Sequence, residues 1–177
     1  MNHKKLRIAV DMDEVLADPL SKFIALYNRD YNVPLDLQIS PGNEIHHHVP
    51  EHAKDKWYEY INEPGFFRDL PVIDKSQEVM KALNNHYDIY IVSAALEFRN
   101  SLIDKYDWLA EHFPFIPWTN IVFCGDKIVD TDILIDDRIK NFSNFKGRKL
   151  LFTSPHNLLI THYERVNNWT EVADKLL

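Results

Sequence analysis

Four groups of chemically reactive side chains in this chain each lie at or shortly after the end of a short apolar segment. The groups comprise two acidic pairs, a serine and a lysine: Asp11 with Asp13, Ser93, Lys127, and Asp136 with Asp137. The apolar runs before them are typical of buried strands in a parallel sheet. Because the carboxyl ends of parallel strands lie at one edge, where open α/β sheets bind ligands, we expect these side chains to converge on one crevice.

The first acidic pair is the most specific of these signals. It lies in residues 11–18 (DMDEVLAD) and directly follows the apolar run at residues 6–10 (LRIAV). Many acidic pairs are merely solvated, but few of them follow an apolar strand and precede a Val-Leu sequence. Two carboxylates so spaced can place one side chain toward a metal ion and a reacting centre, and the other beside them. The pair therefore indicates a reaction site.

Each of the other three groups has an ordinary structural alternative. Ser93 could cap the helix that follows it, and Lys127 could be a solvated lysine near Asp126 and Asp130. The pair at residues 136–137 could form a turn. These alternatives would all have to hold together, whereas one shared crevice explains every placement. Arg138, which follows the second pair, is expected to pair with a carboxylate or to lie exposed.

The elements that position these groups follow a strand–helix rhythm. We expect strands at residues 6–10, 87–92, 121–124, 133–135 and 150–152. One helix is expected to begin at Pro19, with Asp18 as its N-cap, and another at Ser76. A last helix is expected after Thr170, which would be its N-cap. A further helix carries the apolar residues Leu102, Ile103, Tyr106, Leu109 and Phe113. This alternation predicts an α/β fold, a three-layer sandwich with a mainly parallel sheet.

One segment breaks the rhythm. Residues 33–72 are rich in proline, histidine and aromatic residues and contain no good strand, so we expect a small helical insertion with a helix near residues 51–62. The predicted domains are a core of residues 1–18 and 73–177 and a cap of residues 19–72, linking helix included. Because the insertion follows the first strand, it can stand over that strand's tip.

The aromatic and histidine residues of the insertion have mostly structural interpretations. Neighbouring residues diverge on a helix or strand, so residues 46–48 (HHH) are expected in a loop near the entrance and not as one metal site. Most of the aromatic residues are expected to form the insertion's own core. Phe66 and Phe67 are the candidates to face the entrance, where a ring could stack on a nucleobase.

Composition excludes several functions. The chain has 177 residues, 45% hydrophobic and 27% charged, and a formal net charge of −7, which argues against binding a nucleic-acid polymer. No apolar run approaches the ~20 residues of a membrane span, and no signal-peptide pattern is present at the N-terminus. The single cysteine, Cys124, excludes an internal disulfide and is expected in the core. We therefore expect a cytoplasmic protein without a membrane partner; a homodimer is compatible with the sequence.

In this order, the four groups resemble those of the haloacid dehalogenase (HAD) superfamily of phosphoryl-transfer enzymes, over most of the chain. Residues 11–18, 126–129 (DKIV) and 134–138 (LIDDR) more closely resemble the 5′(3′)-deoxyribonucleotidases. Members of that family often have Gly where this chain has Glu14. The sequence Ser93-Ala94-Ala95 also differs from the Thr-Ser or Ser-Pro type of some members. Both departures bear on base and sugar preference and leave the superfamily unchanged.

The resemblance implies a Mg²⁺-dependent hydrolase that passes through an aspartyl-phosphate. Asp11 would be the nucleophile, because an anionic carboxylate can attack a phosphomonoester once metal neutralises the charge. Asp13 would protonate the leaving alkoxide and then deprotonate the attacking water, a role typically worth ~10²–10⁴ in rate.

The same resemblance assigns the binding groups. Mg²⁺ would be held by Asp11, the backbone carbonyl of Asp13, and Asp136 or Asp137. Phosphate would be bound by Lys127 and by the Ser93 hydroxyl and nearby backbone N–H groups, such as that of Ala94.

The substrate implied by the resemblance is a deoxynucleoside monophosphate, with the cap closing over it to exclude water and select the leaving group. A sugar phosphate or another small phosphomonoester is the alternative, because the core groups alone cannot separate these substrates. A module that is phosphorylated on Asp without turnover is a more remote alternative. Receiver domains of that kind carry the phosphorylated Asp on a central strand, whereas here Asp11 follows the first strand and Asp13 lies two residues on.

Overall fold

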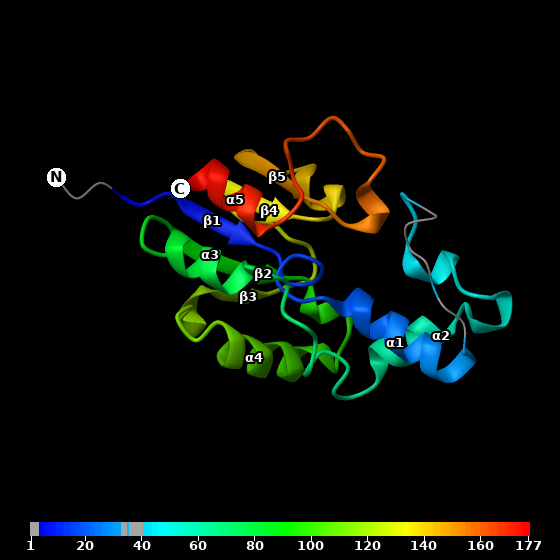
Figure 1. Cartoon of the computed structure of the whole chain (residues 1–177). Coiled ribbons are helices and arrows are strands. Elements are labelled where there is room, and N and C mark those ends of the chain that lie inside the picture. Colours follow the sequence, from blue (N-terminus) through cyan, green and yellow to red (C-terminus); the bar gives the residue numbers. More distant parts are fainter. Residues whose placement is uncertain (1–3, 33–34, 36–40) are drawn as a thin grey trace.

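A computed structural model describes residues 4–32, 35 and 41–177 of the chain. In this part, six parallel strands form one sheet in the order β3-β2-β1-β4-β5-β6. Their bounds are β1 Arg7–Val10, β2 Asp88–Ser93, β3 Ile121–Phe123, β4 Ile133–Asp136, β5 Arg148–Phe152 and β6 Arg165–Val166. Figure 1 shows the central strands side by side, with helices packed against them. The predicted α/β fold with a parallel sheet is confirmed.

The strands follow from the apolar runs of the sequence. All five predicted strands are present with bounds within two residues of those expected. The strand β6 was not predicted, because two residues are too short for any periodicity to show. It exists through its pairing with β5, in which Leu151 and Phe152 lie opposite Arg165 and Val166.

The described residues form five α-helices and several short 3-10 helices. The α-helices are α1 Pro19–Tyr31, α2 Lys56–Asn62, α3 Ser76–Leu83, α4 Ser101–His112 and α5 Trp169–Leu176. The 3-10 helices are η2 Ile45–His47, η3 Glu51–Ala53, η4 Ala95–Glu97, η5 Trp118–Asn120, η6 Ile139–Phe142 and η7 Pro155–Asn157. The helix predicted over residues 51–62 is thus a 3-10 turn followed by α2, a combination that is common where helices begin.

Of the two residues predicted to cap helices, one does so and the other does not. Asp18 caps α1 as expected, because its Oδ1 accepts a hydrogen bond from the Ser21 amide at 2.9 Å. The prediction of Thr170 as the cap of the last helix is wrong. Asn168 has the extended backbone of an N-cap, and its Oδ1 accepts from the Glu171 amide at 3.0 Å, so Thr170 lies inside the first turn.

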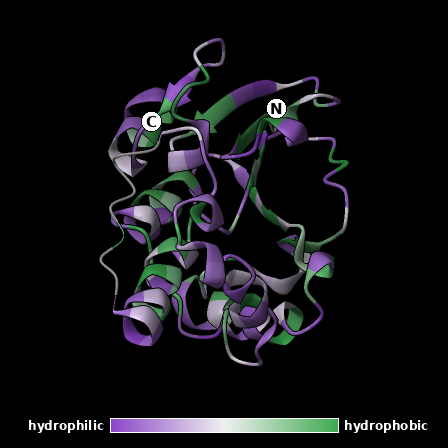
Figure 2. Cartoon of the chain, turned by 90° about the vertical axis from the view of Figure 1, so that its right-hand side faces the viewer, coloured by the Kyte–Doolittle hydropathy of each residue, from purple (hydrophilic) through white to green (hydrophobic). Residues whose placement is uncertain are grey.

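The two faces of the sheet are covered differently. The larger apolar cluster joins one face of the sheet to buried residues of α1, α3, α4 and α5, including Phe23, Met80, Trp108 and Trp169. A smaller cluster on the other face contains Phe142 of η6. Figure 2 shows the helices with mixed hydrophobic and hydrophilic surfaces, as expected of helices that cover a sheet from outside.

Helix α4 buries a face that its apolar residues do not mark. Ile103 and Tyr106 are 63% and 46% exposed, whereas the charged residues Asp104 and Lys105 are buried. Asp104 Oδ2 accepts a hydrogen bond from the Gly65 amide at 2.9 Å, which joins α4 to the insertion. The apolar periodicity predicted this helix, but it did not predict that charged residues share its buried face with Trp108 and Leu109.

The insertion lies beyond the carboxyl end of the sheet. Figure 1 shows α1 and α2 side by side in this position, and the structure records contacts between them. The domain boundaries at residues 18 and 72 stay a prediction. No helix among the described residues is long and apolar enough to cross a membrane.

Candidate active site

The predicted reactive groups meet where the strand order reverses. Successive strands are added on one side of β1 as far as β3 and on the other side from β4 onward, so β1 and β4 flank the switch point. Asp11 directly follows β1, and Asp136 is the last residue of β4. Crevices outside the carboxyl ends of strands at such a point are where open α/β sheets bind ligands.

Lys127 connects the two acidic groups. Its Nζ lies 2.5 Å from Asp11 Oδ1 and 2.9 Å from Asp136 Oδ2, and its side chain is only 3% exposed. Burial lowers the pKa of Lys127, but Asp11 and Asp136 outweigh it, so the net shift is upward and the lysine stays charged. Burial also raises the pKa of Asp11, against the lowering effect of Lys127. Lys127 therefore supplies the local positive charge that makes the buried Asp11 carboxylate tolerable.

The two members of the second acidic pair have different surroundings. Both oxygens of Asp136 are occupied by donors, namely Lys127, the Arg138 amide at 2.8 Å and the Asn141 side-chain amide. Asp137 is equally buried, but its Oδ1 has no hydrogen-bond partner. The sequence left open which member would ligate a metal, and the free oxygen belongs to Asp137.

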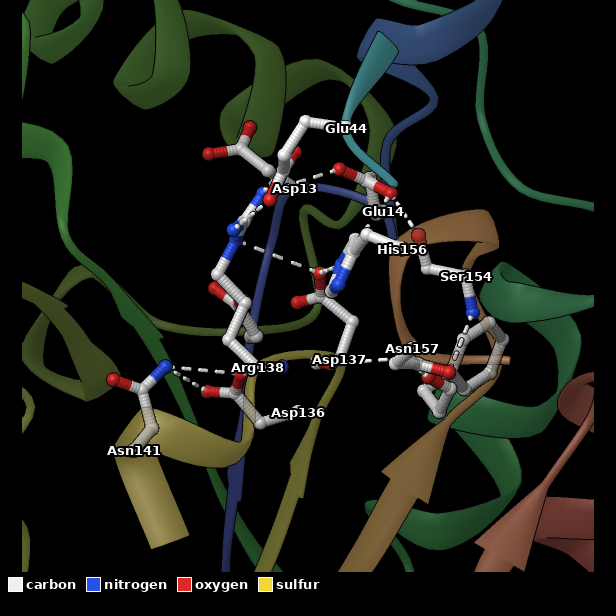
Figure 3. A network of polar contacts seen from close by, with 12 residues as sticks. Asp13, Glu14, Glu44, Asp136, Asp137, Arg138, Asn141, Ser154, His156 and Asn157 are labelled. Atoms are coloured by element: carbon white, nitrogen blue, oxygen red, sulfur yellow. Dashed lines mark hydrogen bonds and ion pairs between the residues drawn. The ribbon is translucent and has the colours of Figure 1, made fainter. Parts of the chain in front are cut away.

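Asp137 lies in a polar network that reaches the insertion (Figure 3). Its Oδ2 lies 2.6 Å from His156 Nε2, and Arg138 pairs with Glu44 of the insertion through two contacts of 2.7 and 3.2 Å. Arg138 thus pairs with a carboxylate, as expected. Burial raises the pKa of Asp137 well above its usual range, and it raises that of Glu14 to about 7.

Lys105 of α4 is a site residue that the sequence did not reveal. It is 1% exposed, and its Nζ lies 2.5 Å from Asp13 Oδ2 and 3.1 Å from Ser93 Oγ. The Ser93 hydroxyl is fully buried at the end of β2 and accepts this hydrogen bond, while Ala94 lines the cavity. No sequence signal marked Lys105, because it follows no strand and lies within an amphipathic helix.

Several of the predicted reactive groups line a cavity of about 310 Å³, whereas Ser93 and Asp136 are not among its described lining residues. Its floor includes five charged residues, namely Asp11, Asp13, Lys105, Lys127 and Asp137. The same cavity is lined by a set of rings that we call the aromatic wall, comprising Phe23, His46, Trp57, Phe67 and Phe98. The cavity thus joins a group of carboxylates and lysines to ring surfaces suited to a planar apolar group.

The two phenylalanines predicted to face the entrance lie in different places. Phe67 lines the cavity and carries Lys105 Nζ at 4.5 Å from its ring centre. Phe66 is not among the described residues that line the cavity. It is 3% exposed and packs on Phe23 with ring centres 4.8 Å apart, so it belongs to the core of the insertion.

The predicted histidine loop forms η2 and its C-cap. His46 lines the cavity and stacks on Trp57, with ring centres 5.1 Å apart and an angle of 24° between the planes. Burial lowers the pKa of His46, and the neighbouring His47 lowers it further. A neutral ring stacked on an indole is part of an aromatic surface.

The acidic residues of the floor fit a hard divalent cation. Oxygens of Asp11, Asp136 and Asp137 lie within 4.8 Å of one another. Two cations lie beside these buried carboxylates, Lys127 and Arg138, and Arg138 is shared with Glu44, while Asp137 Oδ1 has no hydrogen-bond partner. Oxygen ligands of this kind, in this number, suit Mg²⁺.

Comparisons of sequence identify the family. Residues 4–177 match the model of the family described as 5′ nucleotidase, deoxy (Pyrimidine), cytosolic type C protein. The chain is 41% identical over 178 residues to proteins of Bacillus subtilis strain 168 and of Bacillus phage SPbeta. Each match covers 96% of this chain and 98% of the relative, and both relatives bear the name 5′(3′)-deoxyribonucleotidase.

Comparisons of structure agree on the fold. A magnesium-bound HAD-hydrolase of Bacillus subtilis matches with a TM-score of 0.59 at 15% identity, covering 98% of this chain and 99% of the other. A haloacid dehalogenase-like hydrolase of Streptococcus pneumoniae matches with a TM-score of 0.58 at 11% identity, covering 98% and 99%. At these identities the likeness establishes a shared HAD-type fold.

Proposed function

This chain belongs to the 5′(3′)-deoxyribonucleotidase family and is a phosphomonoester hydrolase that acts on deoxynucleotides; we propose that it works through an aspartyl-phosphate on Asp11. The observation that carries this proposal is the position of Asp11 at the switch point, buried and held by Lys127. No other carboxylate in the cavity both follows β1 and has a second carboxylate two residues further on.

The reaction has two displacements. A carboxylate oxygen of Asp11 attacks phosphorus, the bond to the sugar oxygen breaks, and Asp13 gives its proton to the leaving alkoxide. Asp13 then takes a proton from a water molecule, whose oxygen attacks phosphorus and releases phosphate and free Asp11. Lys105 holds Asp13 in place for both proton transfers, and it also fixes the Ser93 hydroxyl.

The residues that would hold Mg²⁺ are Asp11, the backbone carbonyl of Asp13, and Asp137 through its free Oδ1. When bound, Mg²⁺ neutralises the phosphate dianion and thereby lets an anionic nucleophile approach it. Asp136 supports the site indirectly, because its oxygens already accept hydrogen bonds from Lys127, Arg138 and Asn141.

The aromatic wall is proposed to bind the nucleobase. Trp57, stacked on His46, and Phe67 line the same cavity as the carboxylates, and stacking on such rings tolerates different bases. Phe66 is left out of this proposal because it packs inside the insertion. The cytoplasmic location and the homodimer stay predictions.

The test is phosphate release from a panel of deoxynucleoside 5′- and 3′-monophosphates, ribonucleotides and sugar phosphates. We expect deoxynucleotides to be preferred. A sugar phosphate that exceeds every deoxynucleotide in kcat/KM would favour the alternative substrate class.

Metal dependence is tested on the same panel. We expect EDTA to abolish activity, Mg²⁺ to restore it and Ca²⁺ not to, because Ca²⁺ takes larger and looser oxygen shells that misplace the nucleophile. Full activity in metal-free protein would contradict the metal assignment.

A further inference from the structure

Glu14 has a backbone conformation that L-amino acids rarely adopt. Its φ is 60°, in the left-handed region that favours glycine, and it follows Asp13 directly. Strained positions of this kind persist where the surrounding structure over-determines them, and they cluster at functional sites. Glycine would meet the backbone requirement without strain, so the side chain of Glu14 must contribute something that glycine lacks.

The Glu14 carboxylate is buried among polar partners from two other segments. It accepts a hydrogen bond from the Ser154 hydroxyl. Its Oε1 lies 3.7 Å from Arg138, its Oε2 lies 3.8 Å from His156 Nε2, and the side chain is 17% exposed. Glu14 therefore ties the loop after β1 to the turn after β5, where Ser154 and His156 lie.

His156 carries this connection to Asp137. His156 Nε2 lies 2.6 Å from Asp137 Oδ2, while Asn157 donates to the Asp137 backbone carbonyl at 2.8 Å. In its ionised form, the form that ligates a metal, the Asp137 carboxylate only accepts hydrogen bonds, so in that form His156 Nε2 donates to Oδ2. This contact occupies Oδ2 and leaves the buried Oδ1 without a partner. Figure 3 shows the side chains of Glu14, His156 and Asp137 pointing toward one another from separate segments.

We propose that Glu14 and His156 are positioning residues that hold Asp137 with Oδ1 free and thereby set the affinity of the site for Mg²⁺. The inference rests on the metal site of the proposed function. Groups that hydrogen-bond to metal ligands fix the ligands' orientation, and their loss typically costs ~10–100-fold in metal affinity or activity. In this chain Ser154 hydrogen-bonds to Glu14, Glu14 lies 3.8 Å from His156 Nε2, and His156 contacts Asp137, so these side chains join the segments that follow β1, β4 and β5.

The first experiment measures Mg²⁺ binding to metal-free protein by isothermal titration calorimetry, without substrate. We expect His156→Ala to raise the Kd for Mg²⁺ about 10- to 100-fold. His156→Gln should recover much of the affinity, because its amide N–H can still donate to Asp137. The matched control is His162→Ala, a change of an exposed histidine a few residues on, which should leave the Kd unchanged.

The second variant, Glu14→Gly, separates positioning from general stability. Glycine relieves the left-handed strain, so we expect the Tm in EDTA to stay the same or rise. The Kd for Mg²⁺ should nevertheless rise severalfold, since His156 loses its support. A merely structural role for Glu14 predicts the opposite result, a lower Tm with an unchanged Kd.

Steady-state kinetics give a further readout. The Mg²⁺ concentration for half-maximal activity should rise in His156→Ala and Glu14→Gly, while kcat at saturating Mg²⁺ stays within a few-fold of wild type. If His156→Ala does not fold, His156→Gln and Glu14→Gly decide the question by the same titration.

The outcomes separate this inference from the proposed function. Wild-type Kd values in folded His156→Ala and Glu14→Gly overturn the inference even if deoxynucleotides are hydrolysed as proposed. Weaker Mg²⁺ binding in these variants supports it even if the substrate proves to be a different phosphomonoester. A wild-type protein that binds no Mg²⁺ overturns both the inference and the metal assignment.

Discussion

The floor and the aromatic wall of the cavity are built in different ways. Most floor residues lie at or shortly after the ends of strands, so the sheet itself brings them together. The wall residues come from α1, η2, α2, the segment after α2 and the segment after η4, and they meet only because the insertion packs over the sheet edge. Backbone pairing therefore places the floor, which we propose carries the chemistry, and side-chain packing places the wall, which we propose selects the leaving group.

Replacing Asp11, the proposed nucleophile on the floor, should have the largest effect on activity, and this effect should not depend on contacts with the aromatic wall. Asp11→Asn should lower kcat on the order of 10⁴-fold or more for every phosphomonoester, since an amide cannot form the aspartyl-phosphate and loss of a nucleophile is among the largest single-residue effects. Phosphate release and trapping of the phosphoenzyme measure this. Substantial turnover by an Asp11→Asn protein with a wild-type circular dichroism spectrum would remove Asp11 from the mechanism.

Lys105 tests whether the floor extends beyond the residues at the strand ends. Lys105→Met keeps the length of the side chain but removes the charge beside Asp13 and Ser93, and we expect a loss of about 10²-fold in kcat. The loss should be greater for deoxynucleotides than for p-nitrophenyl phosphate, whose leaving group needs less protonation. The control is Lys81→Met on α3, an exposed lysine away from the cavity. Equal losses across leaving groups would place Lys105 outside the acid–base step.

Trp57 tests the wall. Loss of a stacked ring typically costs ~1–3 kcal/mol per base, so Trp57→Ala should lower kcat/KM for a deoxynucleotide by about 10- to 100-fold. Activity on glycerol 2-phosphate, which is too small to reach the wall, should stay near wild type. The matched control is Tyr58→Ala, because Tyr58 is the next residue on α2 and is 59% exposed. If both substrates lose activity together in Trp57→Ala, the wall acts on cap folding and not on base binding.

The smallest effect, a change in stability, is expected in an exposed charge cluster away from the cavity. This cluster serves as a reference for the buried charges of the floor. Arg148, and to a smaller extent Lys175, lower the pKa of Glu164 from 4.5 to about 2. The ionised form is therefore favoured in the folded state, and its stabilising effect is present above pH 4.5 and is lost as the pH falls toward 2.

Glu164→Gln should accordingly lower the free energy of unfolding at pH 7 by less than about 1 kcal/mol, as is usual for solvent-screened pairs. The difference from wild type should shrink between pH 4.5 and pH 2 and leave kcat unchanged. Urea denaturation across this pH range measures it. A difference that grows on acidification would show that the sign of the linkage is wrong.

The sequence predicted the floor well because local rules suffice there. An apolar run followed by acidic residues specifies a strand and its end, and parallel pairing then places Asp11, Lys127 and Asp136 at one edge without further information. The cap of α1 by Asp18 is equally local.

The sequence did not predict features that depend on contacts between distant segments. Lys105 was hidden because its helix buries charges, and β6 because two residues acquire strand geometry only by pairing with β5. Phe66 and Phe67 are neighbours with the same chemistry, yet only Phe67 lines the cavity, since Phe66 packs on Phe23 of α1.

By itself, then, the sequence determined a parallel α/β core and an acidic, lysine-bearing edge able to transfer a phosphoryl group. The physical reason is that strand ends and their periodicity are set by residues close together in the chain. Only the tertiary structure decided that Asp137 keeps a free oxygen, that Lys105 contacts Asp13, and which rings line the cavity. Each of these depends on side chains brought together by packing from segments far apart in the chain, and no local pattern encodes them.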